Sequence, residues 1–333
     1  MPKQFAIAGT IRRAVMRSVA AAAVVAALCA APALADYPDR PVTIICPFAP
    51  GGPTDLVARV LANALSQKLG QSVVVDNKAG AGGNIGISAV ARAKPDGYTL
   101  LVSSSAFVVN PGLYANAPYD PFKDFAPLVF LGTQPNALVA NPKAGINSLQ
   151  ELIERARKEP DRFNYASPGS GTTPQLAAEL IKLRTGINLT HVPYNGAGPA
   201  TQAVVGGTTE LALTSLTSLL PHIKSGALKP LVQTGAERWV DIPDVPTMAE
   251  AGIPNAVSET FQILLAPAGT PQPILDRLIK ESLEAMERGD VRERLLAAGF
   301  GPTAKGPDYL RQRIAEEVPM WRDVVRQAGI KVE

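Results

Sequence analysis

Short apolar runs that end in glycine-rich turns, each followed by a stretch of helical periodicity, recur along this chain of 333 residues. The first unit begins with the β-branched run at 42–48 and breaks at Gly51 and Gly52. It continues with apolar residues at helical spacing up to Gly70, and further strand-like runs follow. Alternation of this kind predicts an α/β fold with parallel strands covered by helices.

A second complete alternation begins near residue 135. Ser148 and Glu151 have the spacing of a capping box, and Pro174 suits the first turn of a later helix. After about residue 234 the pattern changes to a proline-rich stretch, a strand, and two long helices that finish the chain. One large doubly wound sheet is the alternative. A new alternation in mid-chain favours two sheets, and hence two lobes.

Four strand-to-helix turns share one design, in which small residues separate the strand end from the helix start. Helix N-termini present unpaired N–H groups and a partial positive charge, which favour an anion. Glycine lets the backbone approach a ligand closely, and in open α/β sheets such turns line the crevice at the strand ends. The four turns are 50–55, 79–84, 168–173 and 195–198. In the second turn, Asn84 is expected to cap a helix that runs to Ala93.

The sequence lacks the motifs of nucleotide-binding, metal-binding and catalytic sites. No phosphate loop of the form G-x-x-x-x-G-K-[ST] occurs, and 79–86 lacks the spacing of a dinucleotide fingerprint. The two histidines, His191 and His222, have no partners at metal-ligand spacing, so we expect no metal site and a hydrogen-bonded core role for His191. Ser170 has no paired base and is expected to donate a hydrogen bond. Cys46 lies in an apolar run and is expected to be buried and inert.

Residues 1–35 have the pattern of a cleavable signal peptide, which predicts a periplasmic location. Four basic residues precede an apolar run, and Ala33-Leu34-Ala35 suits signal peptidase. The run is too short for a membrane anchor, which is the alternative, while Arg12-Arg13 leaves twin-arginine export open. The chain has 32 basic and 29 acidic residues, so residues 36–333 have 28 against 29, a formal charge of −1. That balance argues against nucleic acid as a partner.

Successive motifs of this chain resemble those of one receptor family. The segments Tyr37-Pro38-Asp39-Arg40-Pro41-Val42 and Pro47-Phe48-Ala49-Pro50-Gly51-Gly52-Pro53-Thr54-Asp55 are similar to the start of mature Bug-type receptors, the periplasmic solute-binding proteins of tripartite tricarboxylate transporters. The resemblance covers essentially all of 36–333. Its further motifs are Asn77-Lys78-Ala79-Gly80-Ala81-Gly82-Gly83-Asn84-Ile85-Gly86, Lys94-Pro95-Asp96-Gly97-Tyr98-Thr99-Leu100, Val192-Pro193-Tyr194 and Ala266-Pro267-Ala268-Gly269-Thr270-Pro271.

The resemblance implies a type II periplasmic-binding-protein fold, with two α/β lobes joined by two crossover segments around a ligand cleft. Lobe one would comprise 36–133 and 234–333, and lobe two 134–233. The ligand would be held by backbone N–H groups, small hydroxyls and bridging waters as the lobes close. The expected ligand-binding positions are Pro50, Gly51, Gly52, Thr54, Asp55, Ala81, Gly82, Gly83, Asn84, Ser103, Ser104, Ser105, Gly169, Ser170, Gly171, Thr172, Gln175, Tyr194, Asn195, Gly196, Ala197, Thr214 and Ser215.

Two positions depart from the family's pattern. Many members have a histidine where Gln175 stands and an aspartate where Thr214 stands. An aspartate there could meet a cationic part of a ligand, whereas Thr214 and Ser215 offer neutral hydroxyls. The sequence therefore favours a ligand without an amino group: a di-, tri- or aromatic carboxylate.

The predicted function is capture of such a carboxylate for a tripartite transporter by a monomeric receptor that is not an enzyme and needs no cofactor. Its partners would be a large and a small integral-membrane subunit. One alternative is a ligand-binding partner of a membrane sensor kinase. The other is a periplasmic hydrolase that uses Ser170 or Ser104. Because backbone groups would hold the ligand, few side chains determine its identity. The sequence therefore does not show which carboxylate is bound.

Overall fold

The computed structural model describes residues 37–114, 116–254 and 256–327. Internal contacts divide the chain between Asp39 and Arg40, and every element named below belongs to the unit Arg40–Glu333. The predicted signal peptide, 1–35, lies outside the described residues.

Two groups of parallel strands confirm the two alternations predicted from the sequence. β1 pairs in parallel with β2 and β3, and β5 pairs in parallel with β6 and β7. The strands are β1 (Val42–Cys46), β2 (Val73–Asn77), β3 (Thr99–Ser104), β4 (Phe125–Ala140), β5 (Asn164–Ser167), β6 (Thr190–Pro193), β7 (Leu211–Ser215), β8 (Lys229–Gln233), β9 (Glu259–Pro267) and β10 (Gly301–Lys305).

The long strand β4 joins the two parallel groups. Its first part, Phe125 to Pro135, pairs antiparallel with β9, and its last part, Asn136 to Ala140, pairs antiparallel with β7 and β8. The strand order is β2-β1-β3-β9-β4-β7-β5-β6, with β8 and β10 also paired to β4. A strand of 16 residues spans about 50 Å, which is long enough to serve both groups. The two expected sheets therefore share β4 and form one connected hydrogen-bonded path.

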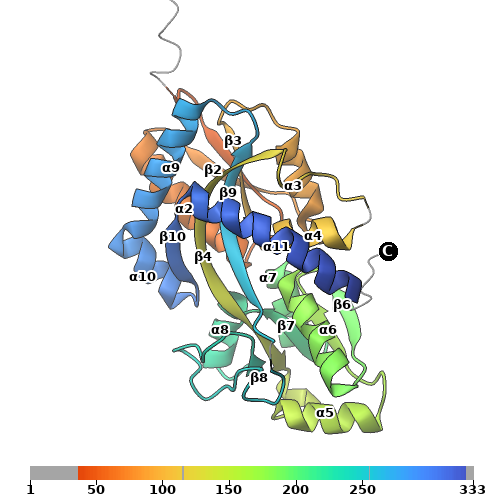
Figure 1. Cartoon of the computed structure of the whole chain (residues 1–333). Helices are drawn as coiled ribbons and strands as arrows, with labels where there is room; N and C mark the ends of the chain where they lie inside the picture. Colours follow the sequence, from red (N-terminus) through yellow and green to blue (C-terminus); the bar gives the residue numbers. More distant parts are fainter. Residues whose placement is uncertain (1–36, 115, 255, 328–333) are drawn as a thin grey trace, which may run out of the picture. The chain divides into compact units, whose positions relative to one another are not determined.

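The helices cover this path, and Figure 1 shows α11 lying across β4 beside α4. In the first parallel group α2 packs against the strands and against α9, while in the second α6 and α7 pack against β7. The helices are α2 (Pro53–Leu69), α3 (Asn84–Ala91), α4 (Ala106–Leu113), α5 (Leu149–Lys158), α6 (Thr173–Thr185), α7 (Ala197–Gly206), α8 (Leu216–Lys224), α9 (Gln272–Glu287), α10 (Gly289–Ala297) and α11 (Pro307–Gln327), with 3₁₀ turns η1 (Ala81–Gly83) and η2 (Pro142–Ala144).

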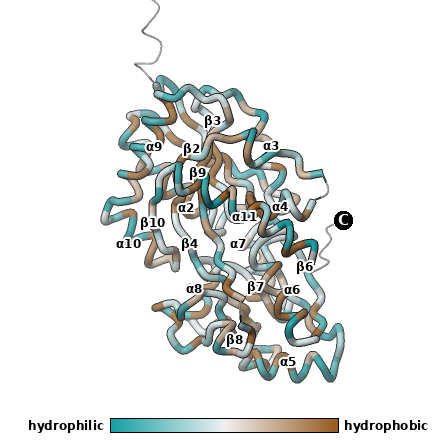
Figure 2. Tube along the Cα trace, viewed as in Figure 1, coloured by the Kyte–Doolittle hydropathy of each residue, from teal (hydrophilic) through white to brown (hydrophobic). Residues whose placement is uncertain are grey.

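Two large apolar clusters form separate cores. One gathers side chains of β3, β9, α4 and α11 around Phe107 and Ile263, and the other gathers β4, β7, α5 and α6 around Tyr165 and Leu213. Met248, which follows β8, packs into the second cluster. Figure 2 shows the apolar residues concentrated along the strands between the helices. Two separate cores are consistent with two lobes. The lobe boundaries at 133 and 234 stay a prediction.

Most of the local features that the sequence predicted, helix caps and the burial of Cys46, are confirmed. Ser148 caps α5, since its side chain accepts a hydrogen bond from Glu151 N at 3.1 Å. The expectation for Asn84 was wrong: Gly83 takes the N-cap position of α3, and Asn84 Oδ1 instead accepts from Asn110 Nδ2 at 2.8 Å. Cys46 is fully buried, and burial raises the pKa of its thiol to about 12, so it is inert as expected.

Candidate functional site

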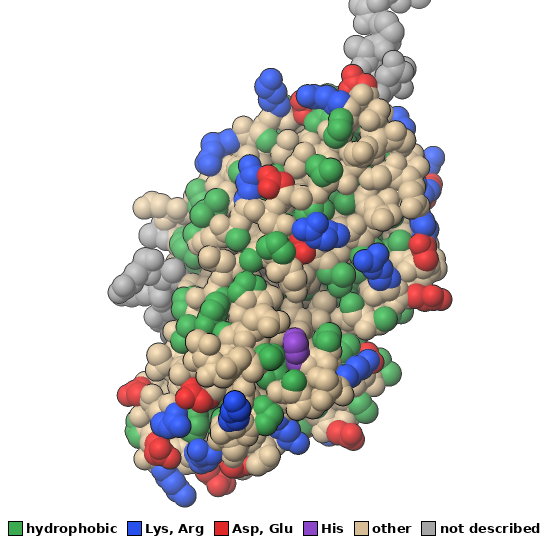
Figure 3. Space-filling view, turned by 180° about the vertical axis from the view of Figure 1, so that it is seen from behind, with side chains coloured by type: hydrophobic (Ala, Val, Ile, Leu, Met, Phe, Trp, Pro, Cys, Tyr) green, Lys and Arg blue, Asp and Glu red, His purple; other side chains and the backbone are tan. Residues whose placement is uncertain are grey.

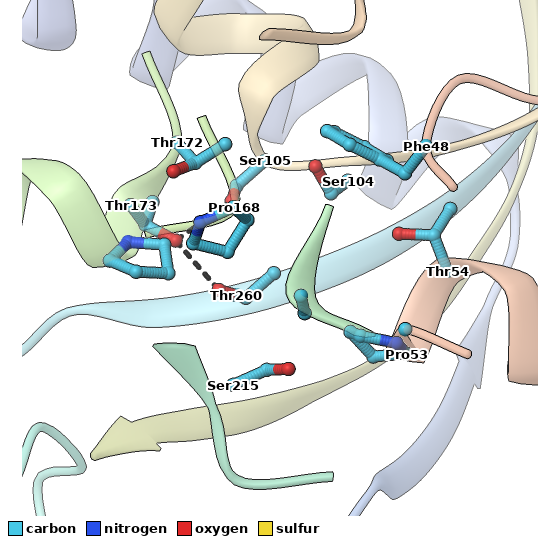
Figure 4. Close-up of a pocket in the computed structure, with 13 residues that line it drawn as sticks. Phe48, Pro53, Thr54, Ser104, Ser105, Pro168, Thr172, Thr173, Ser215 and Thr260 are labelled. Carbon is cyan, nitrogen blue, oxygen red and sulfur yellow. Dashed lines mark hydrogen bonds between the residues drawn. The ribbon is translucent and has the colours of Figure 1, made fainter. Parts of the chain in front are cut away.

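A pocket opens where the ends of several strands meet the starts of the helices that follow them (Figure 4). The space in it that no atom fills is about 360 Å³, which includes the part open to solvent. Both parallel groups contribute to its walls. The lining residues are Phe48, Gly52, Pro53, Thr54, Ser104, Ser105, Pro168, Thr172, Thr173, Pro174, Ala197, Ser215 and Thr260.

Five helix N-termini converge on this pocket. The N-cap residues of α2, α4, α6, α7 and α8 are Gly52, Ser105, Thr172, Gly196 and Ser215. None of these five forms a side-chain capping bond to a described residue of its helix. At the start of α4, Ala106 N donates to Ser104 Oγ at 3.3 Å. Helix N–H groups that no side chain uses remain available to a ligand, and the dipole of each helix favours negative charge there. The arrangement therefore suits an anion.

The lining residues that the structure describes are all uncharged. A preference of the pocket for anions must then come from backbone N–H groups and hydroxyls, and not from a lysine or arginine. Figure 3 shows acidic and basic side chains interspersed over one face of the molecule, without a large area of one sign on that face. No group of His, Cys, Asp or Glu that could hold a metal ion occurs among the residues that the structure describes.

The first and fourth glycine turns contact each other beside the pocket. Ala49 N donates to Asn195 O at 2.8 Å. A Cβ atom added to Gly198 would lie 2.7 Å from Pro50 O, closer than real Cβ contacts allow. Glycine is required at this position because two backbones approach each other across it.

The second and third glycine turns form a similar contact. A Cβ atom on Gly82, whose φ is +61°, would collide with Ser170 O. Asn110 Nδ2 donates to Gly82 O at 3.0 Å, and Tyr114 Oη donates to Ser170 O at 3.4 Å. The four glycine turns thus meet in two pairs, each joining one turn from before residue 100 to one from after residue 165.

A chain of hydrogen bonds crosses the pocket wall from α4 to β4. Thr173 Oγ1 is 3.2 Å from Ser105 Oγ and 2.7 Å from Thr260 Oγ1, and Figure 4 shows Thr173 and Thr260 facing each other. Thr260 Oγ1 donates to Asn136 Oδ1 at 2.9 Å. These bonds hold the start of α6 against the strands β9 and β4, so the wall is built across both parallel groups.

The first turn is held in place by Asp55. Its carboxylate accepts from Gly51 N at 3.1 Å, from Asn77 Nδ2 at 2.9 Å and from Arg59 Nε at 3.0 Å. Burial by itself would raise the pKa of this carboxyl, but the bonds from Arg59, Asn77 and Gly51 outweigh that effect and lower it. Asp55 is therefore ionised at neutral pH and fixes the backbone that enters the pocket.

Known proteins resemble this chain in both sequence and structure. Residues 57–330 match the model of the "Tripartite tricarboxylate transporter family receptor". The chain belongs to this receptor family. Protein BugT of Bordetella pertussis is 41% identical over 307 residues, which are 91% of this chain and 94% of BugT. Solved structures that share this receptor's fold are periplasmic binding proteins, so the expected fold class is confirmed.

Two solved relatives of the receptor were determined with carboxylates. The Rhodopseudomonas palustris protein Rpa4515 with adipate has a TM-score of 0.85 at 33% identity, covering 89% of this chain and 99% of its own. MatC from Rhodopseudomonas palustris, with bound malate, has a TM-score of 0.82 at 35% identity, covering 87% of this chain and 100% of its own.

Only some of the ligand-binding positions that were predicted from the sequence line the pocket. Those that line it are Gly52, Thr54, Ser104, Ser105, Thr172, Ala197 and Ser215. Those that do not line it are Pro50, Gly51, Asp55, Ala81, Gly82, Gly83, Asn84, Ser103, Gly169, Ser170, Gly171, Gln175, Tyr194, Asn195, Gly196 and Thr214. Gln175, for instance, accepts from Gly171 N at 3.4 Å and so supports the third turn from behind.

Sequence reasoning missed the other lining residues of the receptor. They are Phe48, Pro53, Pro168, Thr173, Pro174 and Thr260. Pro53, Pro168 and Thr173 lie inside the predicted turns but were not among the expected positions, and Phe48 and Pro174 lie within two residues of a turn. Thr260 is different, because it lies in β9 and only strand pairing brings it to the pocket.

His191 is hydrogen-bonded in β6, as expected, but it is half-buried on an edge strand and not part of a core. Its Nε2 is 2.6 Å from Ser167 Oγ, and its ring stacks on Tyr165 with centroids 5.0 Å apart. Loss of water lowers the pKa of His191 to about 4. Ser167 is fully buried and also bonds the backbone of Gly169, so this Ser–His pair serves the third turn and faces no substrate.

Proposed function

We propose that this receptor captures a small carboxylate for a tripartite tricarboxylate-type transporter. A dicarboxylate, a tricarboxylate or an aromatic carboxylate would fit the proposal, with the carboxylate held by the helix N-termini of the pocket. The observation that supports it is the convergence of five such N-termini on a space lined by uncharged residues. Relatives determined with adipate and with malate point to the same ligand class.

The partners and the location belong to the same proposal. A large and a small integral-membrane subunit would accept the liganded receptor, which acts as a monomer in the periplasm after residues 1–35 are removed. Within the described ranges, no helix is long and apolar enough to cross a membrane. The receptor carries out no reaction in this proposal. The pairing of His191 with buried Ser167 supports this, since it leaves that histidine no bond to Ser104 or Ser170.

A thermal-shift screen tests the ligand class. Residues 36–333 would be heated with a panel of aliphatic and aromatic carboxylates, each beside its neutral amide, for example succinate beside succinamide. At a concentration about 100 times its Kd, a ligand stabilises the folded state by about 2.7 kcal/mol, which should raise Tm by roughly 4 °C in a protein of this size.

The amides are the control, because they match the acids in shape but carry no negative charge. Equal shifts with acids and amides, or no shift with any acid, would count against the proposal. Aspartate and glutamate belong in the panel as well. Their binding without binding of succinate or glutarate would show that the ligand class excludes plain carboxylates.

A further inference from the structure

Two glutamines are fully buried on the central strands of the receptor. Gln134 lies in β4 and Gln262 in β9, and both have no exposed side-chain surface. In neither of them does the amide oxygen or the amide nitrogen have a hydrogen-bond partner among the described residues. Buried polar atoms in folded proteins are nearly always paired, so two wholly unpaired amides need an explanation.

Strand register places both glutamines on the face of the sheet that carries the pocket. Gln134 is opposite Thr260, and Gln262 is opposite Ser104. Residues that lie directly opposite in paired strands share a face, and both Thr260 and Ser104 line the pocket. The two amides therefore lie on the pocket side of β4 and β9, next to its wall.

Ser215 adds a third unpaired group to the same area. It lines the pocket, has 2% of its surface exposed, and its hydroxyl has no partner within the described part of the chain. It is opposite Asn136, which is two residues beyond Gln134 on β4 and so shares the face of Gln134. Three neutral polar side chains thus stand unpaired on one side of the pocket.

A buried glutamine elsewhere in the same sheet shows that the fold can satisfy such a side chain. Gln233, in β8, is also fully buried, and its Nε2 donates to Val245 O at 2.7 Å while its Oε1 accepts from Trp239 N at 2.8 Å. The contrast indicates that Gln134 and Gln262 have a partner other than the protein. Leaving both side-chain amides unpaired would destabilise the folded protein, with no interaction to compensate.

We propose that Gln134, Gln262 and Ser215 recognise a hydroxyl group on the bound carboxylate, directly or through ordered water, so that the receptor prefers hydroxycarboxylates. This inference rests on the carboxylate function proposed above. A hydroxyl both donates and accepts, and so matches amides whose NH₂ and oxygen are both free. A second carboxylate would satisfy only donors. An ammonium group would be buried here beside uncharged lining residues, without a counter-charge.

Matched ligand pairs test the preference by calorimetry. The pairs are succinate and malate, glutarate and 2-hydroxyglutarate, and benzoate and 4-hydroxybenzoate, titrated into residues 36–333 and into Gln134→Met and Gln262→Met proteins. In the unchanged protein, at least one hydroxylated acid should bind about tenfold more tightly than its partner. In each variant that ratio should fall below about twofold.

Ligand-free melting gives a second readout, with Gln233→Met as the matched control. Gln262→Met removes unpaired amide atoms and should raise Tm, whereas Gln233→Met breaks satisfied bonds and should lower it. A fall of similar size in both proteins would overturn the proposal, as would a hydroxyl preference that survives in both variants. Plain acids that bind as well as their hydroxylated partners would overturn this inference alone. A receptor that binds no acid of any pair would refute the carboxylate function as well.

Discussion

His191 is a titratable side chain whose pKa is displaced well below its ordinary value. Removal from water lowers its pKa from 6.5 to about 4, with Glu179 acting in the opposite direction and Lys182 in the same direction. The folded protein therefore favours the neutral imidazole. Because the unfolded chain binds the proton more readily, this contribution to stability is complete above about pH 6.5 and is lost as pH falls toward about 4.

Replacement of His191 by glutamine should flatten that dependence. Glutamine keeps a hydrogen-bonding group near Ser167 but does not titrate between pH 7 and pH 4. The decrease in unfolding free energy over this range should be smaller in His191→Gln by roughly 2 kcal/mol. Denaturant unfolding at several pH values measures it. Parallel curves for the two proteins would show that His191 does not titrate in this way.

At the scale of elements, the paired glycine turns lead to a prediction within α7. Gly198 and Gly206 both lie in this helix, but only Gly198 contacts the first turn, at Pro50 O. Gly198→Ala should push the turns apart and weaken carboxylate binding by about tenfold or more. Gly206→Ala is the control, since its added Cβ would meet no described atom within 4 Å. Equal affinities in the two variants would mean that the contact is dispensable for binding.

The elements that the sequence did not predict have local features that oppose them. α4 is eight residues long and contains Pro111, and α8 contains Pro221, so neither shows an uninterrupted helical pattern. α4 forms because it packs against α11, far along the chain. The first half of β4, α10 and β10 were also missed. By contrast α11 was predicted at the observed bounds although it contains Pro319, because its 21 residues keep a long apolar period that includes Leu310 and Val325.

The same reasoning explains which parts of the site could be predicted. Glycine turns before helices are visible in the sequence, and residues of the first, third and fourth turns line the pocket. The second turn packs against Ser170 instead, because its partner is decided by the tertiary fold. Gln134 and Gln262 lie within apolar strands, where only the register of β3, β9 and β4 shows that they share a face.

For the whole molecule, the two large apolar cores and the turn pairs between them suggest a clamp that opens. The proposed lobes meet through backbone contacts such as Ala49 N to Asn195 O, through hydroxyl bonds such as Thr173 to Thr260, and through Leu176, which packs into the core around Phe107. Opening would break these contacts. Small-angle scattering should show a larger radius of gyration without ligand and a smaller one with a bound carboxylate. Identical radii in both conditions would argue for a rigid receptor.

The uncharged lining of the pocket also governs how fast and under which conditions the receptor can load. Residues 36–333 have a formal charge of −1, so no long-range field draws an anion toward the opening. Recognition acts over hydrogen-bond distances, where dissolved ions screen little. Association rate and affinity should therefore change by less than about threefold between about 20 mM and about 500 mM NaCl in stopped-flow and calorimetric titrations. A receptor built in this way loads equally well in dilute and in salty surroundings.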